Sequence, residues 1–162
     1  MDYIGEHLLP GQIGQILLVL SLVASLVACF AYAKSTNAKL EIDALSWKKF
    51  ARAAFLVDVV SVLSIFAIIY LVIAKHYFEY YYAWNHSDKS LAPKYLLSSI
   101  WEGQEGSFLL WAFWHGVLGL VLIKTSKKWE APVMTVISFA QFCLASMPNR
   151  TLVKYIAQIK AL

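Results

Sequence analysis

Residues 11–33 read GQIGQILLVLSLVASLVACFAYA and contain no charged side chain over 23 positions. A helix rises about 1.5 Å per residue, so this stretch is long enough to cross a hydrocarbon core of about 30 Å. Three further stretches have the same character: residues 53–74, which hold one charge at Asp58, residues 107–123 and residues 131–147. Because every backbone polar group in lipid needs an internal partner, we expect these four segments to be membrane helices.

The composition of the chain agrees with this interpretation. Its 162 residues are 60% hydrophobic and 15% charged, whereas a soluble domain is near half apolar and a quarter charged. This composition excludes intrinsic disorder and argues against an ordinary water-soluble enzyme. We therefore expect an all-α, polytopic membrane bundle of about four helices over residues 1–147, with an aromatic loop at 75–106. The more polar residues 148–162 are expected to form a short amphipathic tail, which a truncated gene product would explain.

The positions of Lys and Arg predict the orientation in the bilayer. Residues 1–10 have none, residues 34–52 have five, residues 75–106 have three, residues 124–128 have three, and residues 148–162 have three. The three cations of residues 148–162 favour a cytoplasmic tail, against the orientation that fits the other counts best. Cytoplasmic loops carry the excess of these residues, so we expect the N-terminus and loop 75–106 to lie outside. Cys29 and Cys143 should then sit near opposite membrane faces and remain unpaired. The cations are juxtamembrane charges, so the expected surroundings are a lipid bilayer and no nucleic acid.

The loop after the second span is unusually aromatic. Residues 76–86 read HYFEYYYAWNH, with six aromatic residues and two histidines in eleven positions. One interpretation is an aromatic belt at the membrane–water boundary. The other is a platform for a flat apolar ligand such as a porphyrin, with aromatic rings stacked on the macrocycle and a His nitrogen on the iron. Trp84 and His86 are the candidate residues for that platform.

A second unusual stretch, residues 101–111, reads WEGQEGSFLLW directly before the third span. Part of it is explained by a helix start, with Ser107 as the cap and Glu102 and Glu105 near the positive end of the helix dipole. Gly103 and Gly106 would also allow a ligand to approach the backbone, or a positive φ.

This run, W-x-G-x-E-G-S-x-L-L-W, resembles a signature of the CcmF family of cytochrome c-type biogenesis proteins, which commonly reads W-G-G-H-E-G-S-L-L-L-W. Asn85-His86-Ser87 and Leu91–Tyr95 are similar to the segment that precedes the signature in that family. The resemblance implies a multi-pass protein of the bacterial inner membrane, active in cytochrome c maturation. It would handle haem and deliver it for covalent attachment to apocytochrome c at the outer face. Its expected partners are a haem chaperone, apocytochrome c and other maturation subunits.

The resemblance also implies a haem or partner surface, made by Trp101, Gly103, Gln104, Glu105, Gly106, Ser107 and Trp111. Gln104 replaces the usual His of the signature, and Gln is a poor iron ligand. The resemblance covers residues 8–147, which correspond to the N-terminal part of the family. The tryptophan-rich haem motif that follows in the family has no counterpart here, so we expect a partial haem lyase component and assign no catalytic residue. The alternatives are a non-catalytic membrane assembly subunit and, with few polar residues in the spans, a transport or channel subunit.

Two ionisable residues inside the spans have open roles. His115 shares a helical face with Trp111 and Gly119, so it is a candidate haem-iron ligand alongside His86, or a histidine hydrogen-bonded between helices. Asp58 is a functional candidate because ionisable residues inside membranes are rare. The alternative for Asp58 is a packing role near the cytoplasmic interface, neutralised by Arg52 or Lys48.

Overall fold

The structure, a computed structural model, describes residues 7–78, 80–86, 95, 98–101 and 103–158. For residues 81–82, 86, 101, 104–105 and 148–158 it describes the backbone alone. The elements in chain order are the α-helices α1 (Leu8–Asn37), α2 (Glu41–Ala74), α3 (Tyr81–His86), α5 (Gln104–Thr125) and α6 (Glu130–Gln158), with 3-10 helices η1 (Ser98–Trp101) before α5 and η2 (Lys127–Trp129) before α6. The described residues contain no strand, which confirms the expected all-α class.

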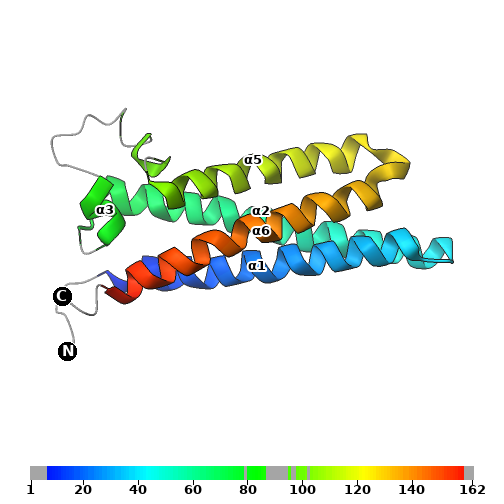
Figure 1. Ribbon diagram of the computed structural model, residues 1–162, viewed down its shortest axis with the longest axis horizontal. Coiled ribbons are helices and arrows are strands. Elements are labelled where there is room, and N and C mark those ends of the chain that lie inside the picture. The colour runs from blue at the N-terminus through cyan, green and yellow to red at the C-terminus, as the bar shows by residue number, and fades with distance from the viewer. Residues whose placement is uncertain (1–6, 79, 87–94, 96–97, 102, 159–162) are drawn as a thin grey trace.

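Helices α1, α2, α5 and α6 are each long and apolar enough to cross a membrane. They form one elongated bundle in which consecutive helices run in opposite directions (Figure 1). Helix α1 packs against α2 and α6, and α5 packs against α6 and α2. The start of α1, α3, η1 and the start of α5 therefore lie at one end, which we call the aromatic end.

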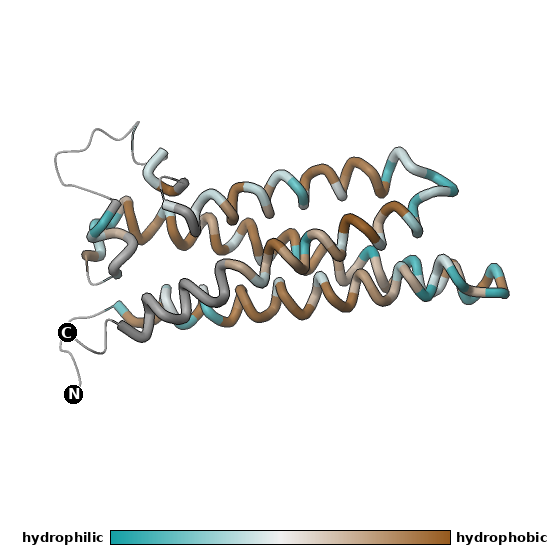
Figure 2. The backbone as a smooth tube through the Cα atoms, in the orientation of Figure 1, coloured by the Kyte–Doolittle hydropathy of each residue, from teal (hydrophilic) through white to brown (hydrophobic). Residues whose placement is uncertain are grey.

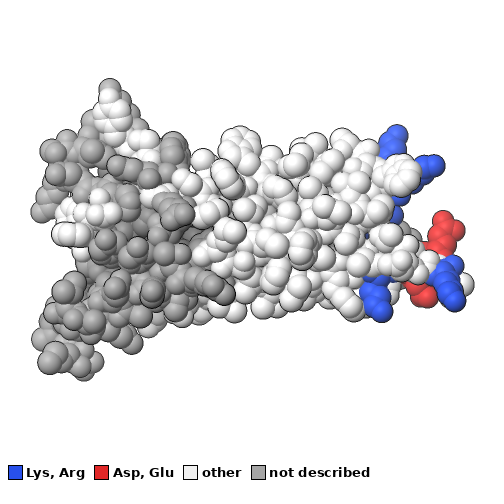
Figure 3. Space-filling model, in the orientation of Figure 1, with Lys and Arg blue, Asp and Glu red and all other residues white. Residues whose placement is uncertain are grey.

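The opposite end of the bundle holds the two short connections, and Lys and Arg side chains gather there (Figure 3). We call it the basic end and define it by Lys34, Lys39, Lys48, Lys49, Lys124, Lys127 and Lys128. Between the two ends the backbone is mainly hydrophobic (Figure 2). The chain thus has the charge distribution of a multi-pass membrane protein.

The bundle is apolar outside and partly polar inside, the reverse of a water-soluble protein. Ile16 and Val136 are each 66% exposed, whereas Ser21, Asp58 and Gln141 are 2% exposed or less. In membranes, polar side chains within the spans face the bundle interior, and apolar ones face lipid. The side-chain distribution therefore supports a membrane-spanning chain independently of helix length.

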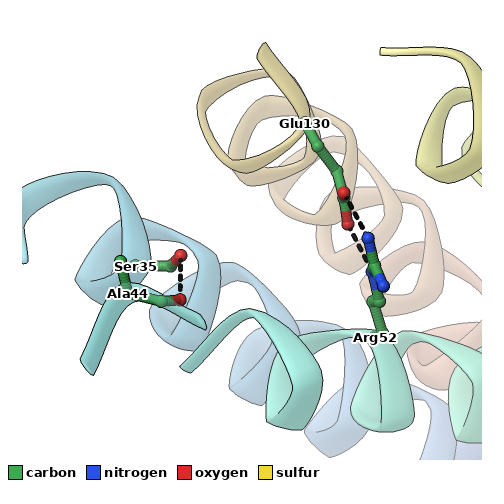
Figure 4. A network of polar contacts seen from close by, with 4 residues as sticks. All are labelled: Ser35, Ala44, Arg52 and Glu130. Atoms are coloured by element: carbon green, nitrogen blue, oxygen red, sulfur yellow. Dashed lines mark hydrogen bonds and ion pairs between the residues drawn. The ribbon is translucent and has the colours of Figure 1, made fainter. Parts of the chain in front are cut away.

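The first connection is much shorter than expected from the sequence. Helix α2 begins at Glu41, so only residues 38–40 remain of the basic loop predicted at 34–52. Glu41 and Asp43 stabilise the positive N-terminal end of α2, and Lys34 stabilises the negative C-terminal end of α1. The Ser35 hydroxyl donates a hydrogen bond of 2.8 Å to the carbonyl of Ala44 and ties the two helix ends together (Figure 4).

An ion pair joins α2 to the start of α6 at the basic end. The Arg52 guanidinium donates from Nε and Nη2 to the two carboxylate oxygens of Glu130, both at 2.6 Å (Figure 4). The Glu130 side chain is 2% exposed and that of Arg52 is 45% exposed. The expectation that Arg52 neutralises Asp58 is therefore wrong, because the Arg52 guanidinium is paired with the Glu130 carboxylate.

The last helix extends past its predicted end. Helix α6 continues from Glu130 to Gln158, beyond the boundary expected at residue 147, so most of the expected tail is helical. The two thiols, Cys29 and Cys143, are free, as expected. Their predicted separation to opposite faces is wrong, since they lie in the adjacent helices α1 and α6 and within electrostatic range of each other.

Candidate functional site in the groove between α5 and α6

An open groove of about 670 Å³ lies between α5 and α6. Small-molecule sites have volumes of about 300–1,000 Å³, so the groove has the size of a cofactor site. Its walls are almost entirely apolar and aromatic, and the lining residues are Trp111, Trp114, His115, Leu118, Phe139, Ala140, Cys143, Leu144 and Met147.

Helical spacing explains why these side chains meet. On α5, residues 111, 114, 115 and 118 follow the three- and four-residue steps that place side chains on one face. On α6, residues 139, 140, 143, 144 and 147 follow the same steps. Trp111 and Trp114 are each 60% exposed, so their rings stand at the open side of the groove rather than inside the bundle.

Two side chains of this wall, His115 and Cys143, are of types that ligate haem iron, and His115 is the one that sequence analysis proposed. Its Nδ1 is buried and has no hydrogen-bond partner. A buried imidazole nitrogen without a partner loses the hydrogen bond that water would give it. The alternative expectation, a histidine hydrogen-bonded between helices, is therefore not met at Nδ1. Because the protein encloses this nitrogen, an iron in the groove would have to be ligated by the other ring nitrogen, Nε2.

The donor set fits a haem better than a bare metal ion. Among the residues described, no group of three His, Cys, Asp or Glu side chains could hold a metal ion together. A haem iron takes only its axial ligands from the protein, and a single His is sufficient in several families. Trp111, Trp114 and Phe139 would offer ring surfaces to the macrocycle, and the groove volume suits a ligand of that class.

The structure places Trp111 and His115 in the same groove, which confirms their shared helical face. Gly119, expected on that face, instead lies against Phe55 and Met134 inside the bundle. Trp84 lies on α3, is 63% exposed and does not line the groove.

The glycine-rich run before α5 behaves differently from the prediction. Gly103, not Ser107, is the N-cap of α5, with an extended conformation at φ −82° rather than a positive φ. The Ser107 hydroxyl donates to the Gly103 carbonyl at 3.2 Å, within the first turn of α5. Gly106 is buried in that turn. The side chains of Trp101, Gln104 and Glu105 lie outside the described part of the structure, as does that of His86.

Part of the aromatic loop closes helix ends. His76 adopts φ 53°, and the N–H groups of His76 and Tyr77 donate to the carbonyls of Ile73 and Val72. This is the Schellman arrangement that ends many helices, with His at the position usually taken by Gly.

Tyr80 and Tyr77 fix the start of α1. The Tyr80 hydroxyl accepts a hydrogen bond of 3.0 Å from the Gly11 N–H and donates to the carbonyl of His7. The His7 ring stacks on Tyr77 with centroids 4.1 Å apart. The Tyr80 hydroxyl thus bridges the Gly11 N–H and the His7 carbonyl, the two groups that would otherwise form the first intrahelical hydrogen bond of α1. These aromatic side chains have structural roles that sequence analysis did not assign.

Sequence reasoning also missed Trp114, Phe139 and Cys143 as groove residues. The spacing of Trp111, Trp114 and His115 could have predicted the α5 wall of the groove, because residues three and four positions apart share one face of a helix.

No family model, no curated protein and no solved structure matches this chain. The function is therefore inferred from the groove and from the sequence itself.

Proposed function

We propose that this chain is a haem-handling membrane subunit of cytochrome c maturation that holds haem in the groove between α5 and α6. The observation that carries the proposal is the groove itself, whose walls are apolar and aromatic and include His115, a residue type that ligates haem iron. An imidazole in such a setting is suited to an iron porphyrin, which needs one or two axial ligands and apolar walls.

The sequence supports the same function from a different direction. The run from Trp101 to Trp111 resembles the signature of the CcmF family, and Trp111 is at once the last residue of that run and a wall of the groove. On this resemblance the chain is a partial haem lyase component that works with a haem chaperone, apocytochrome c and further maturation subunits.

The charges support an orientation in a bacterial inner membrane. Lys and Arg side chains gather at the basic end (Figure 3), and this end would face the cytoplasm. The aromatic end would then face outside, where haem is attached to apocytochrome c. The groove reaches toward this end, since its α5 wall begins at Trp111, seven residues after the start of α5 at Gln104.

In this proposal the protein binds and orients, and the bound haem supplies the vinyl groups that accept the cysteine thiols of apocytochrome c. His115 would hold the iron, and Trp111, Trp114 and Phe139 would fix the plane of the macrocycle. Leu118 and Leu144 would exclude water from the apolar part of the groove.

A channel function has less support from the structure. Ser21, Asp58 and Gln141, the polar side chains buried midway along the bundle, lie between two apolar clusters. One contains Phe55, Val59 and Met134, and the other contains Leu18, Val62 and Leu109. Within the described residues, these clusters interrupt any polar path along the bundle.

The proposal is tested in cells that lack the chain, complemented with variants of it. Covalent haem on c-type cytochromes is measured on denaturing gels, together with the amount of the chain in the membrane. We expect His115→Phe and Trp111→Leu to lower covalent haem at normal chain levels. Trp129→Leu is the matched control, because Trp129 is 65% exposed but lies at the opposite end. Full maturation in cells without the chain would refute the function.

A further inference from the structure

A second polar site lies inside the bundle, away from the groove. Asp58 of α2 is completely buried, and its Oδ1 accepts a hydrogen bond of 2.6 Å from the Ser21 hydroxyl of α1. The Gln141 side chain of α6, also completely buried, approaches the Asp58 carboxyl, and its Nε2 donates to the Ala112 carbonyl of α5 at 3.2 Å. Asp58 and Gln141 thus link all four long helices.

Two oxygens of this site have no hydrogen-bond partner. They are Oδ2 of Asp58 and Oε1 of Gln141. If Asp58 were ionised, both would be acceptors, and neither has a donor at hydrogen-bonding distance, although the Gln141 amide and the unpartnered Ser138 hydroxyl belong to the same polar layer. Exchanging the amide nitrogen and oxygen of Gln141 does not help, because Oε1 would then face the Ala112 carbonyl, another acceptor. If the second N–H of Gln141 Nε2 donated to Asp58 Oδ2, the Gln141 Oε1 oxygen would still have no partner.

The charge on Asp58 would also be uncompensated. Among the described residues no Lys or Arg pairs with it, and Arg52 is bound to Glu130. An isolated carboxylate in an apolar interior is strongly disfavoured and takes up a proton instead. One proton on Oδ2 removes the charge and supplies the missing donor at the same time. Unlike a water molecule or a metal ion, it requires no additional space in the packed interior.

We propose that Asp58 and Gln141 form a proton-binding site inside the four-helix bundle, in which protonated Asp58 Oδ2 donates to Gln141 Oε1 and Ser21 donates to Oδ1. The site holds its proton at neutral pH and is independent of the haem groove. Ionisable side chains inside the spans of other membrane proteins serve as proton carriers. The ligand of the Asp58–Gln141 site is likewise a proton.

The titratable groups on the helices packed around Asp58 are few away from the helix ends. There they are Cys29 and Tyr32 of α1, His115 of α5 and Cys143 of α6. The remaining ones lie toward the helix ends: Lys34 of α1, Glu105 and Lys124 of α5, and Glu130, Arg150, Lys154 and Tyr155 of α6. Glu130 is paired with Arg52, and His115 and Cys143 line the groove between α5 and α6. Serines 21, 25, 61 and 138 complete the polar layer, and the hydroxyls of Ser25 and Ser61 donate to carbonyls of their own helices.

Infrared spectroscopy of the full chain in lipid nanodiscs tests the site directly. A protonated carboxyl group has a C=O stretching band that an ionised one lacks. We expect such a band at neutral pH in the parent chain and its loss in Asp58→Asn. Gln141→Leu should keep the band but shift it, because the acceptor for the proton is removed. Asp43→Asn, at an exposed acid of α2, is the control and should leave the band unchanged.

Thermal unfolding gives a second readout. Asn supplies an N–H where protonated Asp58 supplies an O–H, so Asp58→Asn should fold and unfold at nearly the parent temperature. A carboxylate band in place of the carboxyl band would overturn the proposal. A carboxyl band that appears only after sodium is removed would overturn it in favour of a cation site, and a large loss of stability in Asp58→Asn would show that the charge itself is needed.

Discussion

Gly119→Ala probes the packing of α5 against α2 most sharply. A Cβ at Gly119 would lie 2.3 Å from Cζ and 2.6 Å from Cε1 of Phe55. Ordinary contact begins at 3.4 Å, so the two groups must separate by about 1 Å. The Phe55 ring is fully buried among Ala28, Ala51 and Met134 and has little room to move.

The expected magnitude follows from two opposing effects. Overpacking a well-filled interior destabilises by about 1–3 kcal/mol, and this contact belongs at the upper limit. Replacing Gly by Ala in a helix stabilises by up to about 1 kcal/mol. We therefore expect Gly119→Ala to lower the free energy of unfolding by about 2 kcal/mol. Gly14→Ala is the matched control, because a Cβ there meets nothing within 4 Å and should stabilise.

Thermal unfolding in detergent, followed by circular dichroism, measures both variants. Adding Phe55→Leu to Gly119→Ala removes the clashing ring atoms. The loss of unfolding free energy in the double variant should therefore be smaller, by about 1–2 kcal/mol, than the summed losses of the two single variants. A Gly119→Ala variant as stable as the parent, or a double variant with no coupling, would refute the described contact between α5 and α2.

Three further predictions concern the basic end and the orientation. Arg52→Met should destabilise by about 2–3 kcal/mol in thermal unfolding because it leaves the buried Glu130 carboxylate unpaired, and adding Glu130→Met should recover most of the loss; an unchanged single variant would contradict the ion pair. Lys127→Gly should raise the free energy of unfolding by about 0.5–1 kcal/mol, because Lys127 has the left-handed φ of 44° that glycine adopts without strain. Lys128→Gly is the control and should not stabilise, so equal effects of the two substitutions in thermal unfolding would argue against a left-handed conformation at Lys127. In an otherwise cysteine-free chain, Ser98→Cys should react with an impermeant maleimide from outside and Lys127→Cys only after the membrane is opened; the opposite pattern would reverse the orientation.

The fold could be predicted from the sequence because the bilayer imposes few solutions. Long uncharged stretches such as residues 11–33 must be helical in lipid, so helix number and approximate position followed from length and charge. The ends of the helices were less predictable. Helix α2 begins at Glu41 because acidic residues in its first turn stabilise its start, a local effect that a search for uncharged residues overlooks.

The polar contacts could not be predicted because they depend on which helix faces meet. Arg52 and Glu130 are far apart in the chain, and only the assembled bundle brings the start of α6 within reach of the Arg52 side chain, which makes Glu130 rather than Asp58 its partner. The same holds for Gln141, which the sequence places in the fourth span but cannot direct toward Asp58 or Ala112. Trp111 and His115 were predictable as neighbours because both lie on one helix.

The most direct test of the proposed function is the absorption spectrum of the purified full chain titrated with haem in nanodiscs. The proposal predicts a sharp haem band that saturates with added haem, is lost or displaced in His115→Phe, and is retained in Trp129→Leu. Absence of saturable binding, or an identical spectrum in the parent and His115→Phe, would contradict a haem site at His115 in the groove between α5 and α6.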